Sequence, residues 1–179
     1  MPRTRPELGR EHKVEQILSR AELVARERGL RAVSIAEVAR SLDLSANSVY
    51  WYFPSRDELW IAVVERIAGE AFESKPSDGV SWERQVLWLV DRLADVYPMV
   101  AILQDDARQS PRLAEFHVQL REQLQDMLTE AISVHVPEAT DPAGDALTFV
   151  ALVVGCYALD LPAPQRAGLV EEAMRRLWS

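Results

Sequence analysis

Apolar residues recur at spacings of three and four along most of this chain, which is the period of one face of an α-helix. The first in-phase run comprises Val14, Ile17, Leu18, Ala21, Val24 and Ala25. No stretch alternates apolar and polar residues over enough positions to indicate a β-strand, and no internal repeat is visible. The spacing therefore predicts an all-α protein of about nine helices.

Serines and a proline divide the first third of this pattern into short helices. The sequences S-I-A-E from Ser34 and S-R-D-E from Ser55 are capping boxes, in which a serine oxygen accepts from the backbone amide three residues on. Ser45 is a third candidate N-cap. The helix that it begins must stop before Pro54, because proline disfavours helical geometry in the preceding residue. Residues 75–79, K-P-S-D-G, have the composition of a linker.

Further prolines mark the later helix boundaries. Ser110-Pro111 and Asp141-Pro142 each pair an N-cap residue with proline at the first helical position. They predict helices over residues 111–134 and 142–160. Pro98 is expected to kink or restart the long helix that precedes them.

One of these helices is unusual because residues 146–154 are apolar almost all round. A helix of this kind must be covered on most sides. The pattern is equally compatible with a central core helix and with a helix that packs against a second subunit.

The composition excludes several classes of protein. A single cysteine, Cys156, rules out an intramolecular disulfide and any metal site built from clustered cysteines. No apolar run approaches the roughly 20 residues of a membrane-spanning helix. The first residues are basic but lack the apolar core of a secretory signal. We expect a soluble, cytoplasmic protein with no membrane partner, no metal and no cofactor.

Charge is distributed unevenly along the chain. Residues 1–60 hold ten Arg or Lys and nine Asp or Glu, a balance of +1, whereas residues 61–179 hold ten and nineteen, a balance of −9. Together they give the net charge of −8. The first third is therefore electrostatically distinct from the rest of the chain.

Two short helices around residues 42–45 form the pattern of a helix–turn–helix. The first helix carries a small residue, Ala39, where the two helices would cross. Asp43 lies in the tight turn, and aspartate tolerates the left-handed backbone conformation that such turns often need. A B-DNA major groove admits one α-helix, which the other helix of the pair braces across the backbone. The pattern alone is also compatible with an ordinary helical hairpin.

The run of residues 50–53, Y-W-Y-F, places four rings in consecutive positions. Four consecutive residues span more than one face of a helix, so at least one ring should be partly exposed. Exposed large rings usually mark a contact surface. The alternative is a local hydrophobic core, which we accept for Val49 and Phe53.

The run Val33–Leu59 resembles the DNA-binding signature of the tetracycline-repressor (TetR) family of bacterial transcription regulators. Its most specific part begins at Val49 and reads V-Y-x-Y-F-x-S-R-x-E-L. The all-α pattern and the length agree with the family over the whole chain, although the strong motif covers only residues 12–60. The resemblance implies a helix–turn–helix DNA-binding domain over residues 1–55. It also implies a helical domain over residues 56–179 that binds a small molecule and forms a homodimer.

The chain departs from the family pattern at three positions. Family members usually carry glycine where this chain has Asp43, and often glycine where it has Asn47. Tyr52 replaces a common histidine. Asn47 is the most interesting departure, because asparagine can pair bidentately with adenine N6 and N7.

The resemblance implies that the start of the recognition helix reads bases, while Tyr50, Trp51 and Arg56 flank the groove or contact phosphates. Helix N-termini near Ser34 and Ser55 also offer amides to phosphates. Arg3 and Arg5 would form either a DNA-binding arm or a disordered terminus. The predicted DNA-binding residues are Ser34, Ser45, Ala46, Asn47, Ser48, Tyr50, Trp51 and Arg56.

The resemblance also implies an effector pocket between residues 82 and 157. Its candidate lining is apolar and aromatic, as ligand pockets usually are, although rings at helical spacing also suit an ordinary core. Asp105 and Asp106 would favour a cationic ligand if they face inward, and are otherwise a solvated helix end. The candidates are Trp82, Trp88, Tyr97, Met99, Leu103, Phe116, Phe149 and Tyr157.

The resulting hypothesis is a repressor that binds a pseudo-palindromic double-stranded DNA operator as a homodimer and releases it when an effector binds. An alternative is a dimeric DNA-binding regulator with no small-molecule effector. A further alternative is a helical enzyme. The histidines, His12, His117 and His135, form no metal-binding motif, and the chain has no glycine-rich phosphate loop. We therefore expect no catalytic residues.

Overall fold

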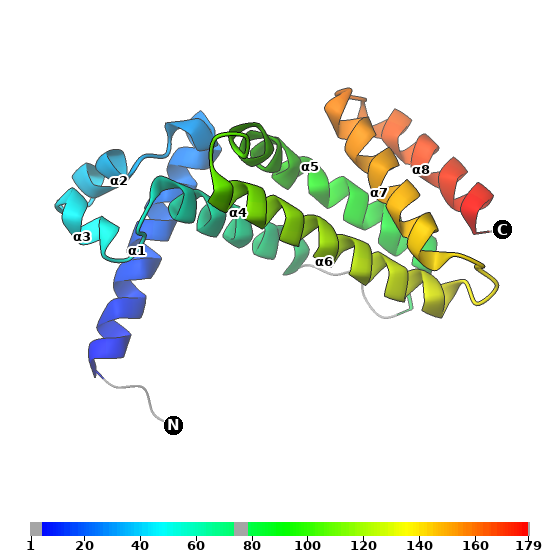
Figure 1. The fold of residues 1–179 in the computed structure, drawn as a ribbon, viewed down its shortest axis with the longest axis horizontal. Helices are drawn as coiled ribbons and strands as arrows, with labels where there is room; N and C mark the ends of the chain where they lie inside the picture. The colour runs from blue at the N-terminus through cyan, green and yellow to red at the C-terminus, as the bar shows by residue number, and fades with distance from the viewer. Residues whose placement is uncertain (1–4, 74–78, 179) are drawn as a thin grey trace. The chain divides into compact units, whose positions relative to one another are not determined.

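The computed structural model describes residues 5–73 and 79–178, and every regular element in these ranges is helical (Figure 1). This confirms the all-α prediction. The elements are α1 (Arg5–Arg28), the 3-10 helix η1 (Leu30–Ala32), α2 (Ile35–Ser41), α3 (Ala46–Tyr50), α4 (Arg56–Glu73), α5 (Trp82–Asp106), α6 (Pro111–His135), α7 (Pro142–Ala158) and α8 (Ala163–Leu177).

The described residues contain eight α-helices rather than about nine, because Pro98 lies inside α5 and does not restart it. Proline removes one backbone hydrogen bond from a helix and crowds the preceding turn. A helix of 25 residues with a buried apolar stripe can retain its helical course despite that loss. The buried stripe of α5 includes Val90 and Val96 before the proline and Leu103 after it.

Side-chain caps begin the helices of the N-terminal third as the sequence predicts. The Oγ atoms of Ser34, Ser45 and Ser55 each accept from the backbone amide three residues on, at 3.1 Å in all three cases. The carboxylates of Glu37 and Glu58, which a capping box would turn back toward the cap, pair with arginines. In these two capping boxes the serine therefore caps the helix, whereas the glutamate pairs with an arginine.

The chain forms two compact units. Unit 1 comprises residues 1–69 and 98–115, and unit 2 comprises residues 70–97 and 116–179. The helices α4, α5 and α6 each contribute to both units. The functional boundary expected between residues 55 and 56 is a different division and stays a prediction. The expected linker at 75–79 lies outside the described residues, except for Gly79.

The core of unit 1 forms around α1 and α4. Ile17 and Ala21 of α1 are fully buried, as are Leu59 and Val63 of α4. Trp60 is also buried, and its indole Nε1 donates to the carbonyl oxygen of Val33 at 2.9 Å. In Figure 1, α2 and α3 lie side by side next to α1.

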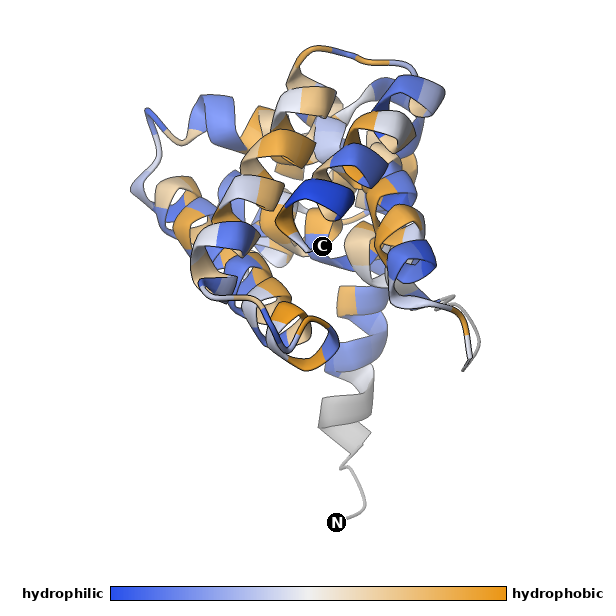
Figure 2. Cartoon of the chain, turned by 90° about the vertical axis from the view of Figure 1, so that its right-hand side faces the viewer, coloured by the Kyte–Doolittle hydropathy of each residue, from blue (hydrophilic) through white to orange (hydrophobic). Residues whose placement is uncertain are grey.

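The core of unit 2 is built from one face of each of its helices. Figure 2 shows the apolar residues of the helices in bands between polar ones. The helix α7 buries Ala146, Phe149 and Val153 in this core. The other members of the buried cluster are Val86, Val90, Leu128, Ile132, Val136, Val170 and Met174. Among the described helices, none has the length and apolarity that crossing a bilayer requires.

Candidate nucleic-acid interface

The helix–turn–helix is formed by α2, a tight turn and α3. The backbone amides of Leu42 and Leu44 both donate to the carbonyl of Ala39, at 3.1 and 2.9 Å. Asp43 has φ +53° and so adopts the left-handed conformation that glycine adopts most easily. Ala39 is buried, which allows α2 and α3 to approach closely. The turn therefore holds the geometry that its sequence predicts, with aspartate in place of glycine.

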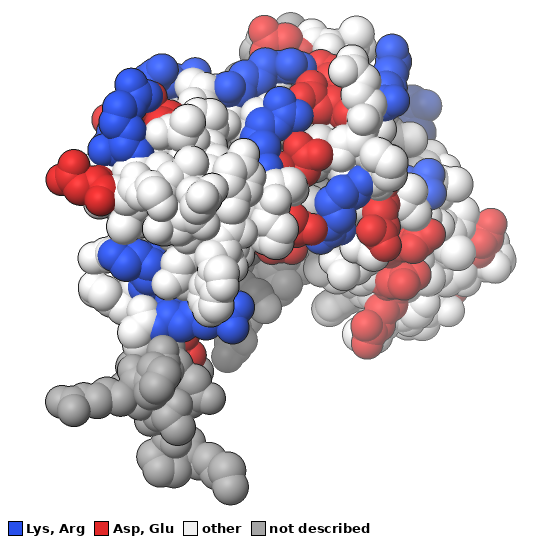
Figure 3. Space-filling model, turned by 60° about the vertical axis from the view of Figure 1, so that its left-hand side comes forward, with Lys and Arg blue, Asp and Glu red and all other residues white. Residues whose placement is uncertain are grey.

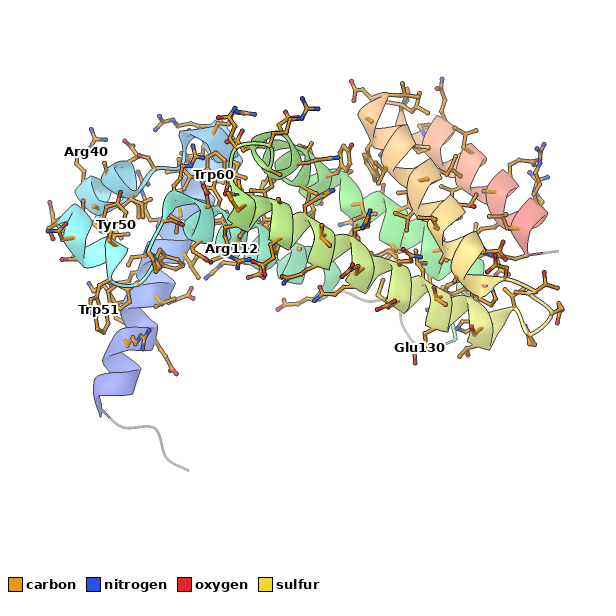
Figure 4. All side chains as sticks on the ribbon, in the orientation of Figure 1. Arg40, Tyr50, Trp51, Trp60, Arg112 and Glu130 are labelled. Carbon is orange, nitrogen blue, oxygen red and sulfur yellow. The ribbon has the colours of Figure 1, made fainter. Side chains whose placement is uncertain are left out.

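The four consecutive rings divide between the core and the surface. Phe53 is buried and Tyr52 is half-buried, whereas Tyr50 is 48% and Trp51 is 68% exposed. Val49 is fully buried and holds α3 against the core of unit 1. Figure 4 labels Tyr50 and Trp51, with Trp51 on the side of α3 nearer α1. The prediction that at least one ring is exposed is confirmed.

Contacts from two sides support the exposed ring of Trp51. The Tyr52 ring meets it edge-on, with centroids 5.2 Å apart and an interplanar angle of 80°. The Arg10 guanidinium of α1 lies 5.3 Å from its centroid, in cation–π geometry. Arg10 was not among the predicted DNA-binding residues. Nothing in the local sequence around Trp51 could have indicated a partner 41 positions earlier.

The polar residues of α3 lie beside this ring. Asn47 and Ser48 are exposed, and with Trp51 and Tyr52 they line a shallow hollow on the surface. The hydroxyl oxygens of Ser45 and Ser48 lie 2.8 Å apart. Ala46 is half-buried. This surface offers amide and hydroxyl groups, which are the groups that hydrogen-bond base edges.

Positive charge flanks this surface. Figure 3 shows a mostly uncharged face at the α2–α3 end of unit 1, with Lys and Arg side chains above and below it. Arg40 of α2 has a side chain that is 75% exposed, and it pairs with Glu37 on the same helix. Arg40 also was not predicted. Its signal in the sequence was its place on the polar face of the first helix of the helix–turn–helix.

Arg56, the predicted phosphate contact, begins α4 and is engaged by its own chain. Its guanidinium carbon lies 4.2 Å from the centre of the Trp60 ring. Its Nη2 atom lies 3.2 Å from a carboxylate oxygen of Asp57 and 3.4 Å from one of Asp106. The Arg56 side chain is nevertheless 50% exposed. It can therefore be reached by a phosphate without unfolding of the helix.

Two further contacts join the first turn of α4 to the start of α6. Asp57 accepts from the Ser110 hydroxyl at 2.6 Å, and Glu58 accepts from Arg112 at 2.7 Å. The hydrogen bond to Glu58 raises the pKa of the Arg112 guanidinium. Ser110 also caps α6, accepting from the amide of Leu113 at 3.2 Å. The sequence predicted this cap, but it did not predict its second role as a donor to α4.

Asp105 and Asp106 face a cation of the same chain. Arg31, just after α1, reaches Asp106 at 3.1 Å and Asp105 at 3.6 Å. The Asp106 side chain is 19% exposed and the Asp105 side chain is 75% exposed. Asp106 is therefore the more firmly held member of the pair.

The candidate pocket residues are distributed over both units. Met99 and Leu103 belong to unit 1, and the other candidates belong to unit 2. Leu103, Phe116 and Phe149 are buried. The remaining five, Trp82, Trp88, Tyr97, Met99 and Tyr157, are half-buried.

Ring contacts bring some of these candidates together within unit 2. Tyr97 stacks on Tyr157 with centroids 5.0 Å apart. Trp82 stacks on His135 at 4.7 Å, and both Trp82 and Phe149 contact the ring of Trp178. The structure thus places Trp82, Phe149 and Tyr157 at one hydrophobic core. Their role as pocket residues stays a prediction.

Two titratable side chains of α7 have pKa values that burial raises. Burial raises the pKa of the Cys156 thiol and of the Tyr157 hydroxyl. The Tyr157 hydroxyl donates to the carbonyl of Val90, and the guanidinium of Arg166 lies 4.7 Å from its ring centre. A raised pKa keeps the thiol protonated and unreactive. In the described part of the chain, no group of three or more His, Cys, Asp or Glu could hold a metal ion.

Comparison with known proteins bears directly on the helix–turn–helix. Residues 17–63 match the sequence profile of bacterial regulatory proteins, tetR family. This match covers the second half of α1, η1, α2, α3 and the first part of α4. The chain has no significant match among curated protein sequences.

Solved structures share the fold over nearly the whole chain. A TetR-family transcriptional regulator from Rhodococcus sp. is 18% identical, with a TM-score of 0.72 over 92% of this chain and 97% of that one. A transcriptional regulator from Saccharomonospora viridis in complex with choline is 16% identical, with a TM-score of 0.72 over 92% and 96%. A TetR transcriptional regulator from Legionella pneumophila is 17% identical, with a TM-score of 0.67 over 91% and 96%.

At these identities the structural likeness establishes the fold, and the sequence match establishes the DNA-binding domain. The two findings agree with the exposed polar surface of α3 and with the buried residues that hold it. Residues 17–63 therefore match the helix–turn–helix region of bacterial regulatory proteins of the tetR family, within a chain that shares the fold of solved TetR-family transcriptional regulators.

Proposed function

We propose that this regulator represses transcription from a pseudo-palindromic operator and releases that operator when a small molecule binds the C-terminal region. The observation that carries the DNA-reading part is the exposed face of α3. Asn47 and Ser48 offer amide and hydroxyl groups there, next to the exposed rings of Tyr50 and Trp51. A polar helix face with basic residues on either side suits a major groove between two phosphate backbones.

The residues have different roles in this proposal. Asn47 and Ser48 read bases, whereas Tyr50 and Arg56 contact phosphates. The helix starts at Ser34 and at Ser45-Ala46 direct backbone amides toward phosphates and so set the position of the protein on the duplex. Trp51, held by Arg10, forms the wall of the reading surface.

A homodimer is supported by a second face of α7. Leu147 and Val154 are 51% and 42% exposed, and Ala151 lies between them on the same face of the helix. The opposite face of α7 is buried in the core of unit 2. An apolar helix with one uncovered face fits a subunit interface, where a second copy covers the same face by two-fold symmetry. A two-fold dimer would match the two half-sites of a pseudo-palindrome.

The proposed effector is a small organic cation. The structure from Saccharomonospora viridis holds choline, a quaternary ammonium ligand, in a chain of the same fold. Unit 2 of this chain contains the stacked rings of Tyr97 and Tyr157, and aromatic faces are the groups that attract such cations. A small organic cation is therefore the first class to test. The alternative of a regulator without an effector remains part of the same test.

Base reading is tested on an operator selected from random duplexes. Asn47→Ala and Ser48→Ala should each lose about 1–3 kcal/mol of preference for the operator over a scrambled duplex. Ser133→Ala, an exposed serine on α6, is the matched control and should keep the preference. Unchanged preference in both α3 variants would reject base reading by these side chains.

The other parts have separate measurements. Leu147→Glu with Val154→Glu should convert a dimer to a monomer in sedimentation equilibrium, whereas a monomeric wild type would reject the homodimer. A thermal-shift screen of organic cations and neutral ligands tests the effector, because a ligand that binds the native state raises Tm. If no compound in a broad screen raises Tm, the regulator without an effector is favoured.

A further inference from the structure

The first turn of α4 is tied to the corner between α5 and α6 by three consecutive residues. Arg56 reaches Asp106 at the end of α5 at 3.4 Å. Asp57 and Glu58 accept from Ser110 and Arg112, respectively, at 2.6 and 2.7 Å. All of these residues belong to unit 1. The α5–α6 corner is therefore in direct contact with the residue proposed to bind phosphate.

The contacts of Arg56 differ in where they come from. Asp57 is its neighbour on α4, so this carboxylate moves with Arg56 and is itself held by Ser110. Asp106 comes from another helix, 50 positions along the chain. Arg31 holds Asp106 from a different direction at 3.1 Å. Asp106 is thus a fixed carboxylate against which the more exposed Arg56 is paired.

We propose that Asp106 restrains Arg56 and thereby weakens the contact of Arg56 with DNA phosphate. The inference rests on the proposed phosphate contact. A phosphate that approaches Arg56 must share the guanidinium with a partly buried carboxylate or displace it. The like charge of that carboxylate also repels the phosphate at short range, where salt screens less. The position of the α5–α6 corner then sets the DNA affinity of α4.

The neighbouring Asp105 provides a matched control. It carries the same charge at the same helix end, and it pairs with Arg31 at 3.6 Å. The contacts of Arg56 are with Asp57, Asp106 and the Trp60 ring. Asp105→Asn therefore removes one negative charge from the corner without removing a partner of Arg56. A difference between the two variants measures the restraint and excludes the general effect of net charge.

The experiment measures Kd for a duplex of unrelated sequence between 50 and 200 mM salt. Asp106→Asn should tighten binding about threefold at the low-salt end and steepen the salt slope by up to about 0.9, the value of one phosphate contact. Asp105→Asn should change Kd by less than about twofold. Asp106→Glu keeps the charge and should stay near wild type. Each variant is titrated at high concentration to fix the fraction that binds, so misfolded protein does not alter the Kd.

The double variant decides the cause. In an Arg56→Ala background, Asp106→Asn should give no more than the effect of Asp105→Asn. Equal effects of Asp106→Asn and Asp105→Asn in the wild-type background would overturn the restraint, as would weaker binding by Asp106→Asn. Arg56→Ala alone tests the proposed function, because loss of a phosphate contact should weaken binding to all sequences and flatten the slope. An unchanged salt slope for Arg56→Ala would reject the proposed phosphate contact of Arg56 and, with it, the restraint by Asp106.

Discussion

The two units hold their helices together by different means. In unit 1, ion pairs connect one helix to another: Arg66 of α4 reaches Glu15 and Glu22 of α1, both at 2.8 Å. In unit 2, Arg92 and Arg176 pair with carboxylates on their own helices. There the contacts between helices include the apolar cluster, the ring contacts and the hydrogen bond from the Tyr157 hydroxyl of α7 to the Val90 carbonyl of α5.

This difference explains how far the sequence match extends. Directional polar contacts require particular residue types at particular positions, and α3 must be held accurately to enter a groove. Apolar packing tolerates many combinations of side chains if the total volume is kept. The match to the family covers residues 17–63, which lie in unit 1, whereas the likeness to solved structures extends over 92% of the chain at 18% identity.

The largest expected effect comes from comparing two tryptophans of unit 1, one with a structural role and one with a proposed role in DNA binding. Trp60 is buried and donates to Val33, whereas Trp51 is 68% exposed. Trp60→Ala should lower the free energy of unfolding by about 3–5 kcal/mol, because it leaves a cavity and an unpaired carbonyl. Trp51→Ala should change that free energy by less than about 0.5 kcal/mol but should weaken operator binding. Urea unfolding and operator titration measure the two effects.

A matched substitution in unit 2 extends this test. Phe149→Ala removes a ring that is as deeply buried as Trp60 and should be similarly destabilising. At a temperature where most of the protein stays folded, it should leave the affinity of α3 for DNA closer to wild type than Trp51→Ala does. Strong destabilisation by Trp51→Ala would show instead that its ring is part of the core.

Much of unit 1 could be predicted because its signals are local. The caps at Ser34, Ser45 and Ser55 each act over three residues, and the four-ring run had to expose a ring because of helix geometry. The engagement of Arg56 by Asp106 could not be predicted, because the two positions are 50 residues apart and each has local alternatives. Pro98 was expected to kink or restart its helix, and α5 continues through it, because packing along the helix outweighs the local preference of proline.

Removing one helix cap in each unit should have an effect on stability of intermediate size. Ser45→Ala and Asp141→Ala each remove one side-chain acceptor at a helix start, with amide distances of 3.1 and 3.0 Å. Each should cost about 1 kcal/mol of stability, measured by urea unfolding. Only Ser45→Ala should weaken operator binding beyond its effect on stability, because Ser45 begins α3. Equal losses of operator affinity in the two variants would indicate a general effect of destabilisation.

The pair between Glu15 and Arg66 gives the smallest expected effect and tests whether inter-helix charge contributes at all. The hydrogen bond from Arg66, supported by one from Ser19, lowers the pKa of the Glu15 carboxyl. A carboxyl whose pKa is lower in the folded state stabilises the protein above its unfolded pKa, and this stabilisation is lost as pH falls through the folded pKa. A double-mutant cycle with Glu15→Gln and Arg66→Gln should therefore give a coupling energy of a few tenths of a kcal/mol at pH 7, which is small because the Glu15 side chain is 56% exposed. This coupling energy should approach zero in acid, where the Glu15 carboxylate is protonated. The same cycle on Glu172 and Arg176, which pair within α8, gives the value for a pair that joins no two helices. A Glu15–Arg66 coupling that persists in acid would show that the contact does not depend on the carboxylate charge, and the contrast between the units would then rest on geometry alone.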